Sequence, residues 1–314
     1  MPVIGFIGTG NMGGALARAA ARSETKAELL LANRSRAKAE RLAGEIGGTV
    51  TDNRTAAERA DWLFLGVKPH LMAELAASLR PVLDARTKKP AVVSMAAGTD
   101  LRRLGELLGA EIPVIRIMPN IPTAVGEGVT LWAAGETVTE EQKTEFCSLL
   151  AASGVLSEVD ERLMDAGTGV TGCGPAYVCM FMEALADGAV ACGLPRKLAL
   201  EYAAQTLIGT ARLLQETGEH PGALKDAVCS PGGSTIQGVR TLERSGFRSA
   251  VTEAVIAAWE KKFRKHRNTP ACRPAGGFIF HRSRAHTSSM VSRRTTTRLS
   301  SGVSITTGGR PRRL

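Results

Sequence analysis

Short apolar runs alternate with helical patterns through residues 1–158. The apolar runs predict strands, and the amphipathic stretches between them predict helices. The expected strands are Val3–Ile7, Glu28–Ala32, Trp62–Val67, Ala91–Ser94, Val114–Ile117 and Val129–Trp132. The expected helices are Met12–Arg22, Arg36–Glu45, Leu71–Leu79, Leu101–Leu108 and Glu140–Ala151. This alternation is typical of a parallel sheet covered by helices, so we predict an α/β domain over residues 1–158.

Strand patterns disappear over residues 159–265, where long helical patterns remain. Pro175–Cys192 and Arg196–Thr217 are apolar-rich and each begins with a proline near its first turn. The first of these carries charge only at Glu183 and Asp187. A helix that is apolar on nearly all sides has to be buried, and a small helical domain offers little cover. We therefore predict an all-α dimerisation domain; burial within one subunit is the alternative.

Charge is concentrated at the C-terminal end. Lys and Arg number 40 against 30 Asp and Glu. Residues 266–314 hold ten arginines and no lysine or acidic residue, so residues 1–265 carry 30 charges of each sign. The net charge of +10 therefore gives no indication that the body binds nucleic acid. The Ser-, Thr- and Arg-rich tail is typical of disorder, and its abrupt start favours a read-through or frame-change artefact over a nucleic-acid-binding arm.

Other compositional features narrow the class of protein. The 314 residues suffice for about two domains. The sequence has no apolar run of about 18 residues and no signal-peptide pattern, so we expect neither a membrane span nor secretion. The six cysteines lack C-x-x-C spacing and partner histidines, which favours reduced thiols in the cytoplasm and no metal site. They are Cys147, Cys173, Cys179, Cys192, Cys229 and Cys272.

A glycine-rich loop, Gly8–Gly13, lies between the first predicted strand and the first predicted helix. Its G-x-G-x-x-G spacing is the dinucleotide-binding pattern in the context that this pattern requires. Gly8 permits a tight turn, Gly10 lets the backbone approach a pyrophosphate, and Gly13 permits close helix packing. We therefore predict a Rossmann-type domain whose helix N-terminus binds phosphate. A glycine turn without a ligand is the alternative.

The residues after the second strand indicate which dinucleotide binds. NAD-binding domains usually place an acidic residue here, about 20 residues after the loop, on the ribose 2′-hydroxyl. This sequence instead has Asn33, Arg34 and Ser35. Arg34 could pair with a 2′-phosphate, and its neighbours could add hydrogen bonds. We predict NADPH as the cofactor, with NADH as the second choice; an arginine that is merely solvated is the alternative.

Further motifs follow three strands and begin two helices. Val67–His70, Ser94–Gly98 and Met118–Asn120 each end a strand, where parallel sheets bind their ligands. Gly172–Tyr177 and Ser230–Thr235 are glycine-rich turns into helices, whose free N–H groups suit a carboxylate. A simple helix cap is the alternative for the second turn.

The side chains of the helical half favour one kind of reduction. Oxidising an alcohol needs a general base, and between residues 160 and 265 the only histidine is His220, which fits a helix end before Pro221. Reducing a C=N bond asks less, because a protonated imine is already electrophilic and positioning supplies most of the catalysis. A carboxylate site with a hydroxyl at the ring nitrogen would suffice, and Thr235 offers that hydroxyl.

The segment Ala223–Ile236 closely resembles the pattern characteristic of pyrroline-5-carboxylate reductases. Lesser motifs that fall in that family's order and spacing are Gly8–Gly13, Val67–Pro69, Ala96–Gly98, Met118–Asn120 and Gly172–Tyr177. The resemblance extends over about residues 3–265. Cys173 departs from it, because a serine is common at that position. The resemblance implies NAD(P)H-dependent reduction of 1-pyrroline-5-carboxylate to L-proline, the last step of proline biosynthesis.

The resemblance also implies an architecture and a set of functional residues. The family has a Rossmann domain and a helical dimerisation domain, and many members assemble five dimers into a decamer. Gly233, Ser234 and Thr235 would hold the substrate with Glu161 nearby, and Thr235 would be the catalytic residue. The cofactor would touch Gly8, Thr9, Gly10, Asn11, Met12, Gly13, Arg34, Asn53, Gly66, Val67, Lys68, Pro69, Met95, Ala96 and Ala97.

Two other functions compete with this interpretation. Reductases of the β-hydroxyacid dehydrogenase type share the glycine loop, but they need a lysine on the linking helix, and residues 160–176 contain none. An NADPH-binding regulator without turnover is the second, and the intact substrate loop counts against it.

Overall fold

The fold is taken from a computed structural model, which describes residues 1–267. The prediction of a basic, disordered tail concerns residues that lie almost wholly outside this range. None of the helices in the described range combines the length and the apolar character that crossing a membrane requires.

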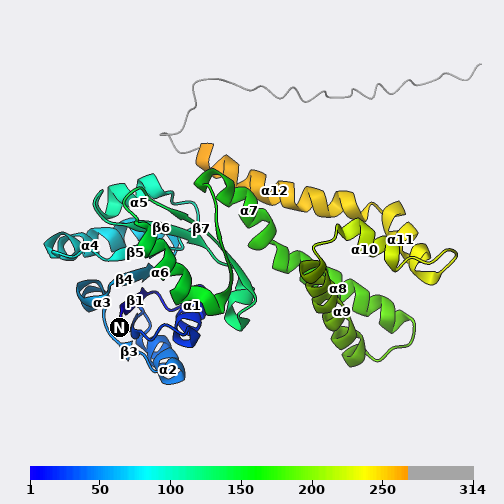
Figure 1. The fold of residues 1–314 in the computed structure, drawn as a ribbon, viewed down its shortest axis with the longest axis horizontal. Helices are drawn as coiled ribbons and strands as arrows, with labels where there is room; N and C mark the ends of the chain where they lie inside the picture. The colour runs from blue at the N-terminus through cyan, green and yellow to red at the C-terminus, as the bar shows by residue number, and fades with distance from the viewer. Residues whose placement is uncertain (268–314) are drawn as a thin grey trace, which may run out of the picture. The chain divides into compact units, whose positions relative to one another are not determined.

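Eight strands form one sheet in the order β3-β2-β1-β4-β5-β6-β7-β8 (Figure 1). The first four are β1 (Val3–Ile7), β2 (Glu28–Ala32), β3 (Thr49–Val50) and β4 (Trp62–Leu65). The others are β5 (Ala91–Ser94), β6 (Val114–Met118), β7 (Gly128–Ala134) and β8 (Gly154–Glu158). All neighbours are parallel except β6 and β7. This confirms the Rossmann-type architecture, with a mixed rather than wholly parallel sheet.

The antiparallel pair has a local cause. Only a short segment with one 3-10 turn, Ile121–Val125, joins β6 to β7. A parallel return needs a crossover of a dozen or more residues, usually a helix, so β7 runs back beside β6.

Helices cover both faces of the sheet. They are α1 (Asn11–Arg22), α2 (Arg36–Ile46), α3 (Asn53–Arg59), α4 (Met72–Ala85), α5 (Leu101–Leu108) and α6 (Glu140–Leu150). On one face α1, α2 and α6 pack over a cluster that includes Phe6 and Phe64, whose rings stack at 4.7 Å. On the other face α3, α4 and α5 bury residues such as Leu63 and Leu79. Burial of these apolar side chains is the main force that stabilises the layers.

The remaining helices follow β8. They are α7 (Met164–Thr171), α8 (Gly174–Ala191), α9 (Arg196–Thr217), α10 (Pro221–Ala227), α11 (Ser234–Arg244) and α12 (Phe247–Arg267). Glu158 ends β8 and a 3-10 turn begins at Glu161. The domain boundary expected between residues 158 and 159 stays a prediction.

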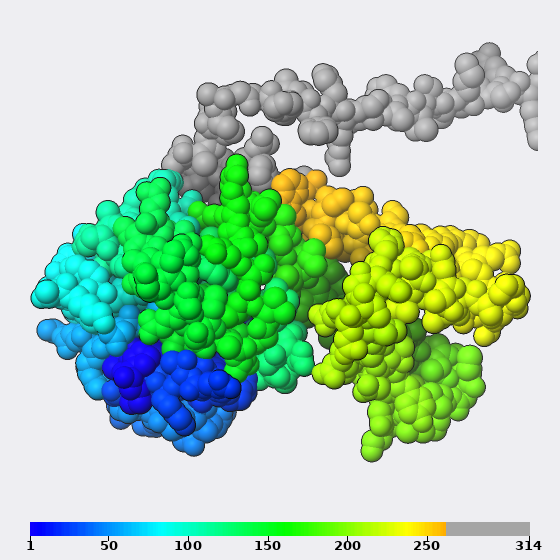
Figure 2. Space-filling model, viewed as in Figure 1, coloured from blue at the N-terminus to red at the C-terminus, as the bar shows by residue number. Residues whose placement is uncertain are grey.

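Helix α8 is apolar and exposed. Ala186 is its one buried residue, whereas Val178 and Met180 are 49% and 69% exposed. Figure 2 shows the side chains of this part of the chain on the molecular surface. Burial of α8 within one subunit, the alternative to an interface, is therefore not what the described chain shows. An exposed apolar face of this extent marks a protein interface.

Candidate active site

The glycine loop that joins β1 to α1 is packed too tightly for side chains at two of its glycines. Gly8 has φ 96°, and a Cβ there would lie 2.6 Å from the Gly66 carbonyl oxygen. A Cβ on Gly13 would lie 2.1 Å from the Gly8 oxygen. At Gly10, by contrast, no atom lies within 4 Å of an added Cβ. The loop therefore presents open space at Gly10, where a diphosphate could approach the backbone.

Two further observations fit a bound phosphate at this loop. No side chain caps α1 at Gly10, so the first N–H groups of the helix remain available to an anion. The Thr9 hydroxyl is buried without a hydrogen-bond partner in the described structure. A buried polar atom without a partner is costly, and a ligand oxygen would satisfy it.

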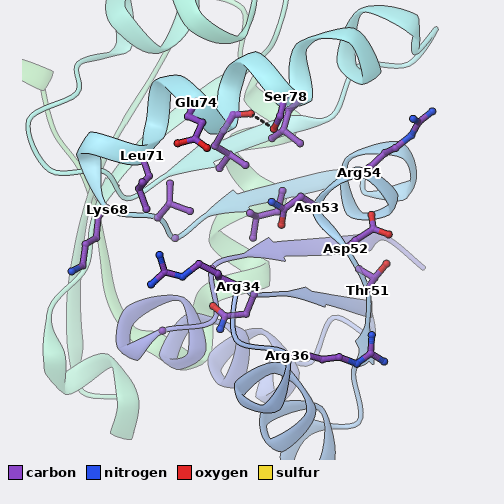
Figure 3. Close-up of a pocket in the computed structure, with 18 of the residues that line it drawn as sticks. Arg34, Arg36, Thr51, Asp52, Asn53, Arg54, Lys68, Leu71, Glu74 and Ser78 are labelled. Carbon is purple, nitrogen blue, oxygen red and sulfur yellow. Dashed lines mark hydrogen bonds between the residues drawn. The ribbon is translucent and has the colours of Figure 1, made fainter.

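A cleft of about 1120 Å³ opens beside the loop (Figure 3). Residues from the ends of β1, β2, β3 and β4 and from α3 and α4 line it. The predicted cofactor residues that it includes are Gly8, Gly10, Asn33, Arg34, Asn53, Gly66, Val67 and Lys68. His70, the last residue of the predicted Val67–His70 motif, also lines the cleft. Sequence reasoning missed several other lining residues, among them Arg36, Thr51, Asp52, Arg54, Leu71, Glu74 and Ser78.

The other predicted cofactor residues lie elsewhere. Thr9 and Asn11 line a small adjoining cavity, which shares Gly10 with the cleft. Met12, Gly13, Pro69, Met95, Ala96 and Ala97 line neither cavity. The cleft therefore brings together the residues expected around the phosphates and the adenosine ribose.

Three arginines belong to the cleft, and two of them are paired. Arg36 donates to Glu40 at 2.8 Å and Arg54 donates to Glu58 at 2.7 Å. Within the described part of the chain, Arg34 makes no ion pair. In Figure 3 its side chain extends toward the side of the cleft where Lys68 lies, whereas Arg36 and Arg54 point outward. Arg34 is thus the guanidinium best placed to pair with an added phosphate.

Asp52 lies at the rim of the cleft and stabilises α3. Its carboxylate accepts the Thr55 N–H at 2.7 Å as the N-cap. This backbone hydrogen bond keeps the pKa of Asp52 below its ordinary value. The Asp-Asn-Arg-Thr sequence is a helix N-terminal pattern, and that signal could have revealed α3 and the rim of the cleft.

The predicted substrate residues begin α11. Gly233 is its N-cap, and Ser234 and Thr235 are exposed in its first turn. No side chain caps this helix, and Gly232 has φ 71°, as a tight turn requires. None of these residues lines the nucleotide cleft in the described chain. The Gly233 N–H donates to the Ser230 carbonyl oxygen at 3.0 Å, which leaves the N–H groups of Ser234 and Thr235 and their two hydroxyls to bind a carboxylate and a ring nitrogen.

Glu161 and His220, which were considered for the substrate site, form hydrogen bonds within the protein. Glu161 Oε1 accepts the Arg116 guanidinium and the Leu101 N–H, both at 2.8 Å. The structure thus places Glu161 against the sheet part of the chain. His220 Nδ1 accepts the Gly222 N–H at 3.0 Å and caps α10, as its place before Pro221 predicts. Within the described residues, no cluster of three or more His, Cys, Asp or Glu could hold a metal.

Comparisons with known protein families give two matches. Residues 161–264 match the family model for pyrroline-5-carboxylate reductase dimerisation. Residues 3–98 match the model described as NADP oxidoreductase, coenzyme F420-dependent.

Individual relatives match over most of their length. Pyrroline-5-carboxylate reductase of Glycine max is 42% identical over 81% of this chain and 93% of its own. The Escherichia coli K12 enzyme is 40% identical over 82% and 96%. The Plasmodium falciparum enzyme, solved with NADP bound, has a TM-score of 0.74 at 30% identity over 83% and 97%. The Coxiella burnetii structure has a TM-score of 0.77 at 32% identity over 84% and 98%.

Proposed function

This chain belongs to the pyrroline-5-carboxylate reductase family, and from that premise we propose which residues carry out its reaction. It is an NADP-dependent oxidoreductase that reduces 1-pyrroline-5-carboxylate to L-proline in proline biosynthesis. A reductase of the β-hydroxyacid dehydrogenase type is not favoured, because the relatives that match over nearly their whole length are pyrroline-5-carboxylate reductases.

The cofactor is proposed to lie along the cleft at the glycine loop. The open backbone at Gly10 would take the diphosphate, and Thr9 and the α1 N-terminus would add hydrogen bonds. Arg34 would pair with the 2′-phosphate, which favours NADPH over NADH. Asn53, Val67 and the neighbouring cleft residues would surround the adenosine ribose. Met95–Ala97, on the next strand end, would lie toward the nicotinamide.

The substrate is proposed to bind at the start of α11. Its carboxylate would accept hydrogen bonds from the N–H groups at Ser234 and Thr235, where the helix dipole also favours an anion, while the Gly233 N–H donates to the Ser230 carbonyl oxygen at 3.0 Å and holds the turn. The Thr235 hydroxyl would then face the ring nitrogen. When bound, the nicotinamide supplies a hydride to the imine carbon beside that nitrogen. Because the protonated imine already carries the proton of the product amine, Thr235 would donate only a hydrogen bond, which stabilises the electron pair that the nitrogen gains.

Homo-oligomerisation follows from the dimerisation domain over residues 161–264 and the exposed α8. We propose a homodimer in which a second copy brings Ser234 and Thr235 to the cleft. The pentamer of dimers remains a prediction from the family resemblance. We also propose that the enzyme works in the cytoplasm, where the free thiols of Cys147, Cys173 and Cys229 would stay reduced.

The single observation that carries this assignment is the uncapped turn at Gly233, with two hydroxyls directly after it. Thr235→Ala should lower kcat roughly 100-fold, as loss of one transition-state hydrogen bond does, and should leave NADPH affinity unchanged. Thr235→Ser should recover much of the rate because it restores the hydroxyl. Steady-state kinetics with both substrates measures these effects.

A matched control lies in the same helix. Thr241 is also exposed on α11, but its hydroxyl donates to the Gln237 carbonyl oxygen at 3.0 Å. Thr241→Ala should keep kcat within about twofold of wild type, since a solvent-exposed substitution away from the site changes little. Equal impairment of Thr235→Ala and Thr235→Ser would assign the effect to packing and reject the proposed hydroxyl role.

A further inference from the structure

Helix α7 connects the sheet to the helices that follow it. Met164, its first residue, is buried with Met118 and Leu131 against the sheet. Gly167 faces β7, because a Cβ there would lie 2.5 Å from Leu131 Cδ1 in that strand. Gly169 faces α12, where an added Cβ would lie 3.4 Å from Val255. Gly167 therefore lets the helix approach β7 closely, and the opposite contact, at Gly169, joins the helix to α12.

The N-terminal end of α7 is held by a buried arginine. The Arg116 side chain of β6 is 5% exposed and donates to Glu161 Oε1 at 2.8 Å. Its second nitrogen lies 3.7 Å from Asp165 Oδ1 in the first turn of α7. The same Glu161 oxygen accepts the Leu101 N–H at the start of α5. A buried guanidinium is costly without a partner, so this arrangement strongly favours one position of the helix.

The C-terminal end of α7 is held by a buried amide. The Asn120 side chain donates through Nδ2 to the Thr171 carbonyl oxygen at 3.0 Å. Its Oδ1 accepts the Val129 N–H of β7 at 2.9 Å. The last carbonyls of a helix have no partner within the helix, and Asn120 satisfies one of them. Asn120 thus ties the end of α7 to the sheet.

The distance along the chain from Arg116 to Asn120 is similar to the length of α7. Asn120 has the extended angles φ −121° and ψ 170° two residues after β6 ends. The four residues from Arg116 to Asn120 can span up to about 13 Å, at about 3.3 Å each. The eight residues of α7 span about 12 Å. Arg116 and Asn120 are therefore far enough apart to contact opposite ends of the helix, whose side packs against β7.

We propose that Arg116 and Asn120 clamp α7 at its two ends and thereby fix the direction in which the substrate-binding helices leave the sheet, so that in the proposed homodimer they meet the nicotinamide side of the second copy's cofactor cleft. Glu161 also fixes Leu101, which follows the Met95–Ala97 segment, and Thr171 directly precedes the turn into α8. The clamp therefore joins the cofactor-binding sheet of each copy to the substrate-binding helices that the same copy offers to the other. The inference rests on the proposed function for the placement of the nicotinamide, and Arg116 and Asn120 act as positioning residues.

Asn120→Asp tests the clamp, because it keeps an acceptor for Val129 but places an oxygen opposite the Thr171 carbonyl. Kinetics with the full chain should show kcat about tenfold or more below wild type, since small misplacements cost large factors in rate. KM for 1-pyrroline-5-carboxylate should rise, and the Kd for NADPH should stay within about twofold, as its loop is untouched. A merely unfolded fraction would lower kcat and leave KM unchanged.

Hydrogen–deuterium exchange gives a second readout that does not depend on activity. Amides of Met164–Thr171 should exchange faster in Asn120→Asp, while those of α2 stay protected as in wild type. Arg116→Lys, which keeps the charge but loses the forked geometry, should also speed exchange at the first turn of α7. This second variant tests the clamp even if Asn120→Asp does not fold.

Glu28→Gln is the matched control. Glu28 pairs with Arg59 at 2.7 Å, and both residues lie in the sheet part away from α7. This variant should leave kcat, KM and α7 exchange as in wild type. Unchanged α7 exchange or unchanged kcat in both clamp variants would overturn the proposal, and so would a parallel rise in the Kd for NADPH. If the wild-type protein did not reduce 1-pyrroline-5-carboxylate, the proposed function would be rejected. Hydrogen–deuterium exchange would still test the clamp, because it does not depend on activity.

Discussion

The side-chain oxygen of Asn33 accepts the backbone N–H of Thr9 at 3.2 Å, so the residue after β2 holds the glycine loop. Its Nδ2 donates to the Ser35 carbonyl at 3.0 Å. Both polar atoms of the Asn33 side chain are therefore hydrogen-bonded within the protein, one to the glycine loop and one to Ser35. Arg34 lies between Asn33 and Ser35, and its side chain remains available to a ligand.

Arg34→Ala should raise the KM for NADPH and leave that for NADH within about twofold. A hydrogen-bonded guanidinium–phosphate pair contributes about 1.5–3 kcal/mol, which is about a tenfold to hundredfold change. Initial rates with each cofactor, at saturating 1-pyrroline-5-carboxylate, measure both constants.

Asn33→Ala serves as the comparison for that experiment. It removes the hydrogen bond to Thr9, so the glycine loop should bind both cofactors less well and by similar factors. Equal losses of NADPH and NADH in Arg34→Ala would show that Arg34 also acts through the loop and does not contact the 2′-phosphate.

Met180→Asp should break the oligomer. Met180 is 69% exposed on α8, and an interface that buries a carboxylate without a partner loses several kcal/mol. Sedimentation velocity should show a smaller species than wild type. Thr144→Asp, which adds the same charge on the exposed side of α6, should sediment like wild type. A Met180→Asp protein of wild-type size would place the interface elsewhere.

Asp61 should make stability depend on pH. Burial raises the pKa of Asp61, but hydrogen bonds from Lys88 at 2.9 Å and from the Val3 N–H at 3.1 Å outweigh it, so the pKa lies below its ordinary value. A lowered folded-state pKa stabilises the fold above the unfolded value of about 4, and this contribution is lost as pH falls further. Asp61→Asn should therefore lower the free energy of unfolding by about 1 kcal/mol at neutral pH.

Denaturant unfolding of wild type and Asp61→Asn at several pH values measures this difference. The gap between the two proteins should close as pH falls below about 4. Lys88→Ala should cost less than Asp61→Asn, because the Lys88 side chain is 82% exposed and such ion pairs contribute little. If the difference in the free energy of unfolding did not change with pH, the charge of Asp61 would not be the cause of its stabilising effect.

Sequence reasoning succeeded where a local pattern determines the structure. Val3–Ile7 and Glu28–Ala32 have the predicted bounds, because each is an apolar run with clear breaks on both sides. The same reasoning missed β3, which has only two residues, and β8, an edge strand of mixed character. It also ended α4 at Leu79, although the helix continues through Pro81 to Ala85.

The candidate site was predicted in part for the same reason. Gly8 and Arg34 belong to contiguous motifs whose chemistry is visible in the sequence. Ser78 lines the cleft only because α4 packs beside α3. A local sequence pattern does not predict such a contact between helices. Arg116 likewise looked like one polar residue in an apolar strand, and its role depends on α7, which is distant in sequence.

The rate of NADPH oxidation by the purified full chain, with and without 1-pyrroline-5-carboxylate, tests the central claim most directly. We predict that oxidation requires the imine, and that one L-proline forms for each NADPH consumed, as chromatography of the product would measure. NADPH oxidation that is independent of the imine, or that proceeds without proline formation, would contradict the account.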